Sequence, residues 1–141
     1  MRGVSEQSFE VRPIGRVESP LRERSEAPRQ GDEGAPESVV RFDGSVAAGL
    51  ADVRAGDALL LLTWLDRADR DVLTVHPRSN PDAPLTGVFS TRSPDRPNPI
   101  GLHRVTVVAV DGIALTVRDL EAIDGTPVLD VKPVLGGIDE R

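Results

Sequence analysis

The stretch HRVTVVAVDGIALTV, residues 103–117, decides the fold class of this chain. Two runs rich in β-branched and apolar residues, His103–Val110 and Ile113–Val117, flank Asp111–Gly112. Asp-Gly between two such runs is the strongest short-range signal for a β-hairpin with a tight turn. The chain is therefore expected to contain antiparallel β-structure, and the remaining sequence indicates how much.

Further apolar runs, separated by turn residues, lie on both sides of this hairpin. A second Asp-Gly, at 124–125, lies between two of them and predicts a second hairpin. The runs expected to be strands are Val11–Glu18, Val39–Phe42, Asp57–Leu65, Asp71–His76, Thr86–Thr91, Leu120–Ile123 and Val128–Val131. At least seven short strands with one or two short helices predict a mainly β fold, a small closed or nearly closed antiparallel β-barrel.

Two of the remaining segments carry local signals of their own. Asp57–Leu65 is almost continuously apolar, which is typical of a strand buried on both faces, and Trp64 is expected in the core. Ser45–Arg54 has apolar residues at helical spacing, with Ser45 as the expected cap.

The length of 141 residues suits one domain with one core. We expect residues 1–10 to be a flexible N-terminus, residues 11–136 to form a single β-barrel domain, and residues 137–141 to be a C-terminal tail. Ser19–Ser38 is rich in Pro, Gly, Glu and Arg and predicts a long loop. Loops of this length in a small domain are often functional.

Composition excludes several kinds of site. Without cysteine the chain has no disulfide, thiolate metal site or cysteine nucleophile. His76 and His103 lack the spacing of metal ligands, so no metal is expected.

The start, MRGVSEQSFEV, lacks an apolar signal-peptide core, and the longest apolar run, 58–65, is too short to cross a bilayer. A cytoplasmic protein without membrane contact is expected.

The net charge of −6 argues against a general nucleic-acid binder. The charge is uneven along the chain, however. Residues 12–30 hold five Arg against three Glu, residues 76–104 hold four Arg against two Asp, and residues 105–131 hold one Arg against five acidic residues. Two basic segments therefore remain candidates for contact with an anionic ligand.

The segment TRSPDRPNPIG, residues 91–101, has three prolines within six residues and two arginines. Each proline fixes φ and restricts the preceding residue, so the loop loses little entropy when it binds a ligand. Arg92 or Arg96 suits a carboxylate or phosphate, and carbonyl groups left without partners suit a cation. A stiff corner between two strands explains the same composition.

Two further segments allow a functional and a structural interpretation. Arg29 and Gln30, within the long loop, can form a polar lid over a pocket or a solvated turn. Asp124, at the second Asp-Gly, can accept from a ligand amine or hydroxyl, and Gly125 allows close backbone approach, but a plain hairpin turn also fits.

Taken together, these motifs resemble one family. IGRVESPL (14–21), APRQG (27–31), GVFSTRSPDRPNPIGLHRV (87–105) and LEAIDGTPVLDVKPVL (120–135) occur in the order and spacing of the TsaA-like proteins. These include the tRNA threonylcarbamoyladenosine methyltransferases. The resemblance covers roughly residues 12–135.

The resemblance implies a small β-barrel that binds S-adenosylmethionine without a Rossmann fold, as a homodimer with the cofactor near the subunit interface. It also implies methyl transfer to the N6 nitrogen of threonylcarbamoyladenosine beside the tRNA anticodon. Transfer is expected to be an in-line displacement with little acid–base chemistry. No catalytic base is assigned.

The resemblance implies site residues only at positions where this sequence matches the motifs of the family. The positions similar to cofactor contacts are Pro28, Arg29, Gln30, Asp66, Arg67, Arg92, Leu102, Asp124, Gly125, Thr126 and Pro127. Asp66 and Arg67 stand where some relatives have His-Gln. Arg96 and Asn98 are expected to face the substrate or to stabilise the turn.

Three functions stay open on the sequence. The first is the tRNA methyltransferase, the second a methyltransferase of this fold that acts on another substrate, and the third a non-catalytic module that binds S-adenosylmethionine. The longer bacterial relatives carry a further C-terminal domain, so tRNA as the partner needs separate support.

Overall fold

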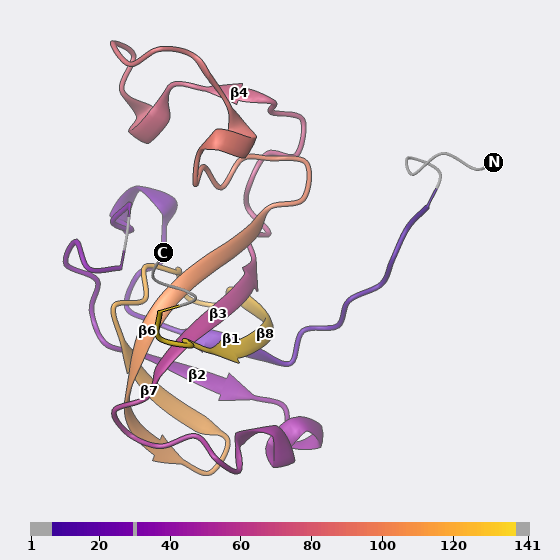
Figure 1. Cartoon of the computed structure of the whole chain (residues 1–141), viewed down its shortest axis with the longest axis vertical. Helices are drawn as coiled ribbons and strands as arrows, with labels where there is room; N and C mark the ends of the chain where they lie inside the picture. The colour runs from indigo at the N-terminus through magenta and orange to yellow at the C-terminus, as the bar shows by residue number, and fades with distance from the viewer. Residues whose placement is uncertain (1–6, 30, 138–141) are drawn as a thin grey trace.

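Six strands close into an antiparallel barrel in the order β1-β2-β7-β6-β3-β8, and β8 pairs back to β1 (Figure 1). The computed structural model describes residues 7–29 and 31–137. The barrel strands are β1 (Gly15–Glu18), β2 (Ser38–Phe42), β3 (Ala58–Trp64), β6 (Ile100–Asp111), β7 (Ala114–Arg118) and β8 (Pro127–Pro133). The prediction of a mainly β, closed antiparallel barrel is confirmed.

Alternation along the strands fills the barrel with small aliphatic side chains. In β3, Leu59, Leu61 and Thr63 are buried, whereas the residues between them are only half-buried. The expectation that this strand is buried on both faces is therefore wrong, because its outer face is not covered by a second layer. Trp64 lies on that outer face, half-buried, with the Arg70 guanidinium carbon 5.2 Å from its ring centroid. The residues that form the core are Val17, Val40, Phe42, Leu59, Leu61, Val105, Val107, Leu115, Val117, Leu120, Ala122 and Val128.

The connection from β3 to β6 forms an insertion at one end of the barrel. Trp64 pairs with Ile100, so the insertion leaves and re-enters the barrel at one point. It contains a two-stranded sheet of β4 (Thr74–Val75) and β5 (Thr86–Gly87), and the 3₁₀ helices η4 (Pro77–Ser79) and η5 (Val88–Ser90). In Figure 1 it lies above the barrel, and the first half of β6 leads down from it.

The predicted helix is shorter and tighter than expected. The chain forms a 3₁₀ helix, η3 (Gly44–Leu50), and Asp43 rather than Ser45 caps it, since its side chain accepts from the Ser45 amide at 2.9 Å. A further 3₁₀ helix, η2 (Arg24–Glu26), lies in the long N-terminal loop. Within residues 7–29 and 31–137, no helix is long and apolar enough to cross a membrane.

Leu120–Ile123 is not a strand, although it was expected to be one. β7 ends at Arg118, and Asp119 adopts a positive φ of 68°, which turns the chain out of the sheet. Leu120 and Ala122 are nevertheless buried in the core. The apolar run therefore fills the barrel without pairing in it, and the Asp124–Gly125 turn leads from it into β8.

Candidate functional site

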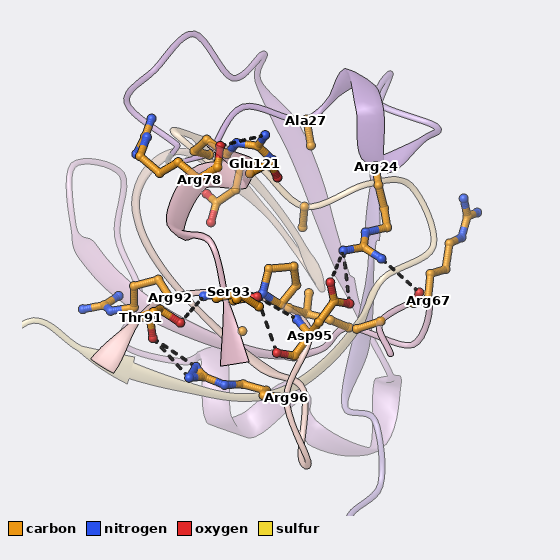
Figure 2. Close-up of a pocket in the computed structure, with 18 of the residues that line it drawn as sticks. Arg24, Ala27, Arg67, Arg78, Thr91, Arg92, Ser93, Asp95, Arg96 and Glu121 are labelled. Atoms are coloured by element: carbon orange, nitrogen blue, oxygen red, sulfur yellow. Dashed lines mark hydrogen bonds and ion pairs between the residues drawn. The ribbon is translucent and has the colours of Figure 1, made fainter. Parts of the chain in front are cut away.

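A pocket of about 1250 Å³ lies between the insertion, the N-terminal loop and one end of the barrel (Figure 2). Small-molecule sites are usually about 300–1,000 Å³. The pocket therefore has room for a nucleotide-sized ligand and part of a second molecule. Its wall comes from four segments that are distant in the sequence: 24–29, 65–96, 100–103 and 121–126.

Most of the residues that the sequence singled out meet at this pocket. Those that line it are Pro28, Arg29, Asp66, Arg67, Arg92, Arg96, Leu102 and Thr126. Asn98, Asp124, Gly125 and Pro127 do not line it, and Gln30 lies outside the described residues. The three motif segments around Arg29, Arg92 and Leu102 thus share one cavity.

The loop 91–101 is held in place by its own polar side chains. The Arg96 guanidinium donates to the carbonyl oxygens of Val88 and Thr91, the latter at 3.1 Å. Asn98 accepts from Arg70 at 3.0 Å, and Arg70 also donates to the Pro97 carbonyl at 2.8 Å. These contacts favour the turn-stabilising role for Arg96 and Asn98.

Ion pairs tie the N-terminal loop to the insertion at the mouth of the pocket. Arg24 holds Asp95 through both carboxylate oxygens, at 3.2 and 3.1 Å (Figure 2). In the same way Arg78 Nη2 donates to both oxygens of Glu33, at 2.7 and 2.8 Å. Contacts at two points restrain one segment against the other more than a single surface ion pair would.

Six arginines but only three carboxylates line the pocket, so its wall is basic although the whole chain is acidic. Two of these arginines, Arg24 and Arg78, are paired with carboxylates as just described, and Arg67 lies 3.5 Å from Glu23. No described residue pairs with the Arg92 guanidinium, however. Arg92 is exposed at the mouth and is free to receive an anionic group.

The Asp124–Gly125 turn makes contacts that stabilise the fold, and it does not line the pocket. The Asp124 carboxylate accepts from the Ser19 amide at 3.0 Å, and the Asp124 amide donates to the Leu21 carbonyl at 2.6 Å. Arg16 donates to the Gly125 carbonyl at 3.1 Å. The turn therefore anchors the start of the N-terminal loop, which carries one wall of the pocket.

A buried polar chain at the pocket was not identified from the sequence. Thr63 Oγ1 lies 2.7 Å from His103 Nε2, and His103 Nδ1 lies 2.5 Å from Glu121 Oε1. Thr63 is fully buried, and His103 is 5% exposed. His103 and Glu121 line the pocket.

One sequence signal could have indicated this chain. His103 occupies the inward-facing set of β6 together with Val105 and Val107, and a polar side chain in such a position needs a partner. Gly101 belongs to the same arrangement. A Cβ there would lie 2.7 Å from His103 Nε2 and would overlap Thr63 Oγ1, so only glycine leaves room for this pair.

Within the described part of the chain, no group of three His, Asp or Glu side chains could hold a metal ion.

Comparison with known proteins finds a family model, relatives and solved structures that are similar to this chain. The family model described as the tRNA-methyltransferase O N-terminal domain matches residues 16–140. A probable S-adenosyl-L-methionine-binding protein of Archaeoglobus fulgidus is 42% identical over 92% of this chain, and one of Methanothermobacter thermautotrophicus is 40% identical over 96%. A crystal structure of TrmO from Pseudomonas aeruginosa superposes with a TM-score of 0.74 at 28% identity, over 95% of this chain.

The relatives differ in length. The chain spans 97% of the Methanothermobacter protein but only 35% of the Archaeoglobus protein and 59% of the Pseudomonas structure. The similarity to the two longer proteins therefore concerns one part of each.

Proposed function

The chain belongs to the family of the tRNA-methyltransferase O N-terminal domain, and on that premise we propose that it is an S-adenosylmethionine-dependent methyltransferase. The observation that carries the proposal is the meeting of three motif segments, around Arg29, Arg92 and Leu102, at one pocket. The names of the archaeal relatives, which are probable S-adenosyl-L-methionine-binding proteins, support the same cofactor.

The pocket offers groups that fit the chemistry of this cofactor. The Arg92 guanidinium has no partner among the described residues and suits a carboxylate at the mouth. Leu102, on the barrel wall, offers an apolar surface for a base. When bound, S-adenosylmethionine supplies a methyl group activated by its positively charged sulfur. The rigid loop and the barrel wall then hold donor and acceptor in line, and this positioning provides most of the rate.

We propose tRNA as the methyl acceptor, at the N6 nitrogen of threonylcarbamoyladenosine beside the anticodon. Six arginines line the pocket, and among them Arg92 has no partner in the described part of the chain, which supports an anionic substrate. Arg22 and Arg24 belong to the N-terminal loop, and Arg24 and Arg92 line the same pocket, so the two basic segments of the sequence converge in space. A cytoplasmic protein follows from this substrate.

Two other functions remain candidates because the whole chain carries a net charge of −6. A methyltransferase of this fold can act on a substrate other than tRNA, and a binding module can hold the cofactor without transferring its methyl group. The experiment must therefore separate binding, transfer and substrate.

Mass spectrometry of nucleosides tests the proposal. A strain that lacks the gene should lose the methylated threonylcarbamoyladenosine, and tRNA from that strain should regain it when treated with pure protein and S-adenosylmethionine. A tRNA transcript without the threonylcarbamoyl group is the matched negative substrate. Persistence of the methylated nucleoside in the strain would exclude the tRNA reaction, and cofactor binding without transfer would favour the binding module.

We also propose that the protein acts as a homodimer with the cofactor near the subunit interface. Phe89, Ile100 and Leu102 are exposed apolar side chains, and all three line the pocket. Apolar groups gathered at one site are typical of a surface that a partner covers.

A further inference from the structure

Glu121 is the carboxylate of the pocket that is held by a buried histidine. Its Oε1 lies 2.5 Å from His103 Nδ1, and His103 is fixed in turn by Thr63. An ionised carboxylate only accepts hydrogen bonds, so Nδ1 carries the proton of this contact. In the neutral imidazole Nε2 is then an acceptor, and the Thr63 hydroxyl donates to it.

This arrangement has two consequences for the chemistry of the pocket. His103 Nε2 is engaged by Thr63 as donor or as acceptor, so this nitrogen is not available to take a proton from a substrate. Glu121 has one oxygen in contact with His103 and keeps a second oxygen for a ligand. The pair is therefore suited to attracting a cation through Glu121 and not to base catalysis.

The second oxygen of Glu121, Oε2, lies beside the backbone of Gly31, and the residue itself lines the pocket. No described residue donates a hydrogen bond to Oε2. A Cβ built on Gly31 would lie 2.9 Å from this oxygen, so the carboxylate lies between His103 and the loop that carries Arg29. Both the Arg29 loop and the wall at Leu102 belong to the proposed cofactor site.

The other two lining carboxylates are placed differently. Asp95 is paired with Arg24 through both of its oxygens, so its charge is balanced. Asp66 is exposed beyond the end of β3. Glu121, whose side chain is 17% exposed, is thus the carboxylate of the pocket wall that can meet a cation away from bulk water.

We infer that Glu121 faces the positively charged sulfur of bound S-adenosylmethionine, so that the pocket binds the methyl donor more tightly than its demethylated product. This inference rests on the proposed function. Arg92 is exposed at the mouth, whereas Glu121 is half-buried in the wall. A cofactor whose carboxylate binds Arg92 would have its amino group, which is on the same carbon, beside that arginine, and its sulfonium further along the molecule and available to Glu121.

The charge of the sulfur changes in the reaction. The bond between the sulfur and the methyl carbon breaks, and its electron pair stays on the sulfur, which becomes a neutral thioether. The methyl carbon bonds to the acceptor nitrogen, whose proton passes to water. Glu121 then loses its attraction for the ligand, which favours product release. Because the attraction is strongest before transfer, it lowers the KM for the donor without raising kcat.

Calorimetric titration of the full chain with S-adenosylmethionine and with S-adenosylhomocysteine tests the inference. The two ligands differ at the sulfur alone. We expect Glu121→Gln to weaken binding of the donor about tenfold and binding of the product less than about threefold, as for loss of one partly buried charge contact. Glu121→Asp should restore part of the preference for the donor. Glu18→Gln, which removes the same charge from an exposed strand outside the pocket, should change neither affinity.

The outcomes separate the inference from the proposed function. Equal losses for both ligands would indicate a contact to a hydroxyl or to the base and would overturn the inference, as would unchanged binding. If Glu121→Gln does not fold, the two affinities of the wild-type protein test the inference instead. Tighter binding of S-adenosylhomocysteine than of S-adenosylmethionine would contradict it. A wild-type protein that binds neither ligand overturns the proposed function, and the inference with it.

Discussion

Arg92 presents to the pocket a guanidinium that no described residue engages. Its replacement therefore removes a ligand contact without breaking a contact of the fold. We expect Arg92→Ala to lower the affinity for S-adenosylmethionine about tenfold or more, the effect of losing one charge-assisted hydrogen bond. Thermal unfolding should be unchanged, and turnover at saturating cofactor should fall less than the affinity does.

The matched control is Arg41→Ala, which removes an exposed arginine from β2, outside the pocket. It should leave cofactor affinity unchanged. An Arg92→Ala protein that binds the cofactor like the wild type but has no turnover would contradict the view that this site works by holding its ligands in line.

Gly31 passes so close to Asp119 that a side chain cannot be accommodated. A Cβ at this position would overlap the Asp119 carbonyl oxygen, which belongs to the rigid backbone. We expect Gly31→Ala to lower the free energy of unfolding by about 1–3 kcal/mol, the usual cost of overpacking, and to weaken cofactor binding because the Arg29 loop is displaced. Urea denaturation and calorimetric titration measure the two effects.

Gly44→Ala provides the comparison, since no atom lies within 4 Å of a Cβ built there and the residue lacks a positive φ. A Gly31→Ala protein as stable as Gly44→Ala would mean that the N-terminal loop adapts to the added methyl group.

The motif residues of the site could be predicted from the sequence, but its non-local contacts could not. Arg29, Arg92 and Leu102 were found through local strings, and they line one pocket. Thr63, His103 and Glu121 meet only because β3 pairs with β6 and because the chain leaves β7 at Asp119. The sequence around each of these three residues does not indicate that the other two lie beside it.

Local turn chemistry predicted one of the two expected Asp-Gly hairpins correctly, and the other prediction, at 124–125, is wrong because 120–123 is not a strand. The Asp111–Gly112 turn joins β6 to β7 as expected, with Gly112 at a φ of 60°. The strand prediction for 120–123 is wrong because an apolar run can fill a barrel without hydrogen-bonding to its strands. The positive φ of Asp119, which takes the chain out of the sheet, could not be read from the sequence. The strands expected at 71–76 and 86–91 are shorter, since β4 and β5 have two residues each and pair with each other outside the barrel.

The pairing of β1 with β2 carries a pH-sensitive contact. Arg41 donates to Glu18 at 2.6 Å, and this hydrogen bond, aided by the charge of Arg41, holds the pKa of Glu18 below its ordinary value of 4.5. A lowered pKa in the folded state stabilises the fold above the unfolded value, and this contribution is lost as the pH falls through the folded value. The difference in Tm between wild type and Glu18→Gln should therefore shrink as the pH is lowered from about 6 to about 3.

The effect should be small because both side chains are more than half exposed. Asp130→Asn is a suitable control, since Asp130 is also exposed and lies 3.6 Å from a cation, Lys132, on β8. A Tm difference for Glu18→Gln that grows on acidification would mean that the ion pair does not stabilise the β1–β2 pairing.

The charge distribution over the whole molecule is compatible with the anionic substrate that we propose for this acidic chain. Six of the sixteen arginines line the pocket between the N-terminal loop and the insertion, whereas residues 105–131, which contribute β7 and parts of β6 and β8, hold one arginine against five acidic residues. A substrate steered by such a field approaches one end of the barrel, and its binding weakens as salt screens the field. Net charge alone is therefore a poor guide to the partner of this chain.

The exposed apolar residues at the same end of the barrel make the proposed dimer testable. Phe89 lies in the insertion, lines the pocket and is 82% exposed. If a second copy covers it, Phe89→Glu places a charge in the interface, so the protein should become monomeric in light scattering, and its cofactor affinity should fall because the pocket adjoins that interface. Phe9→Glu is the matched control, because Phe9 is 87% exposed and lies away from this pocket. Persistence of the dimer in Phe89→Glu, or a monomeric wild type, would place the interface elsewhere or exclude it.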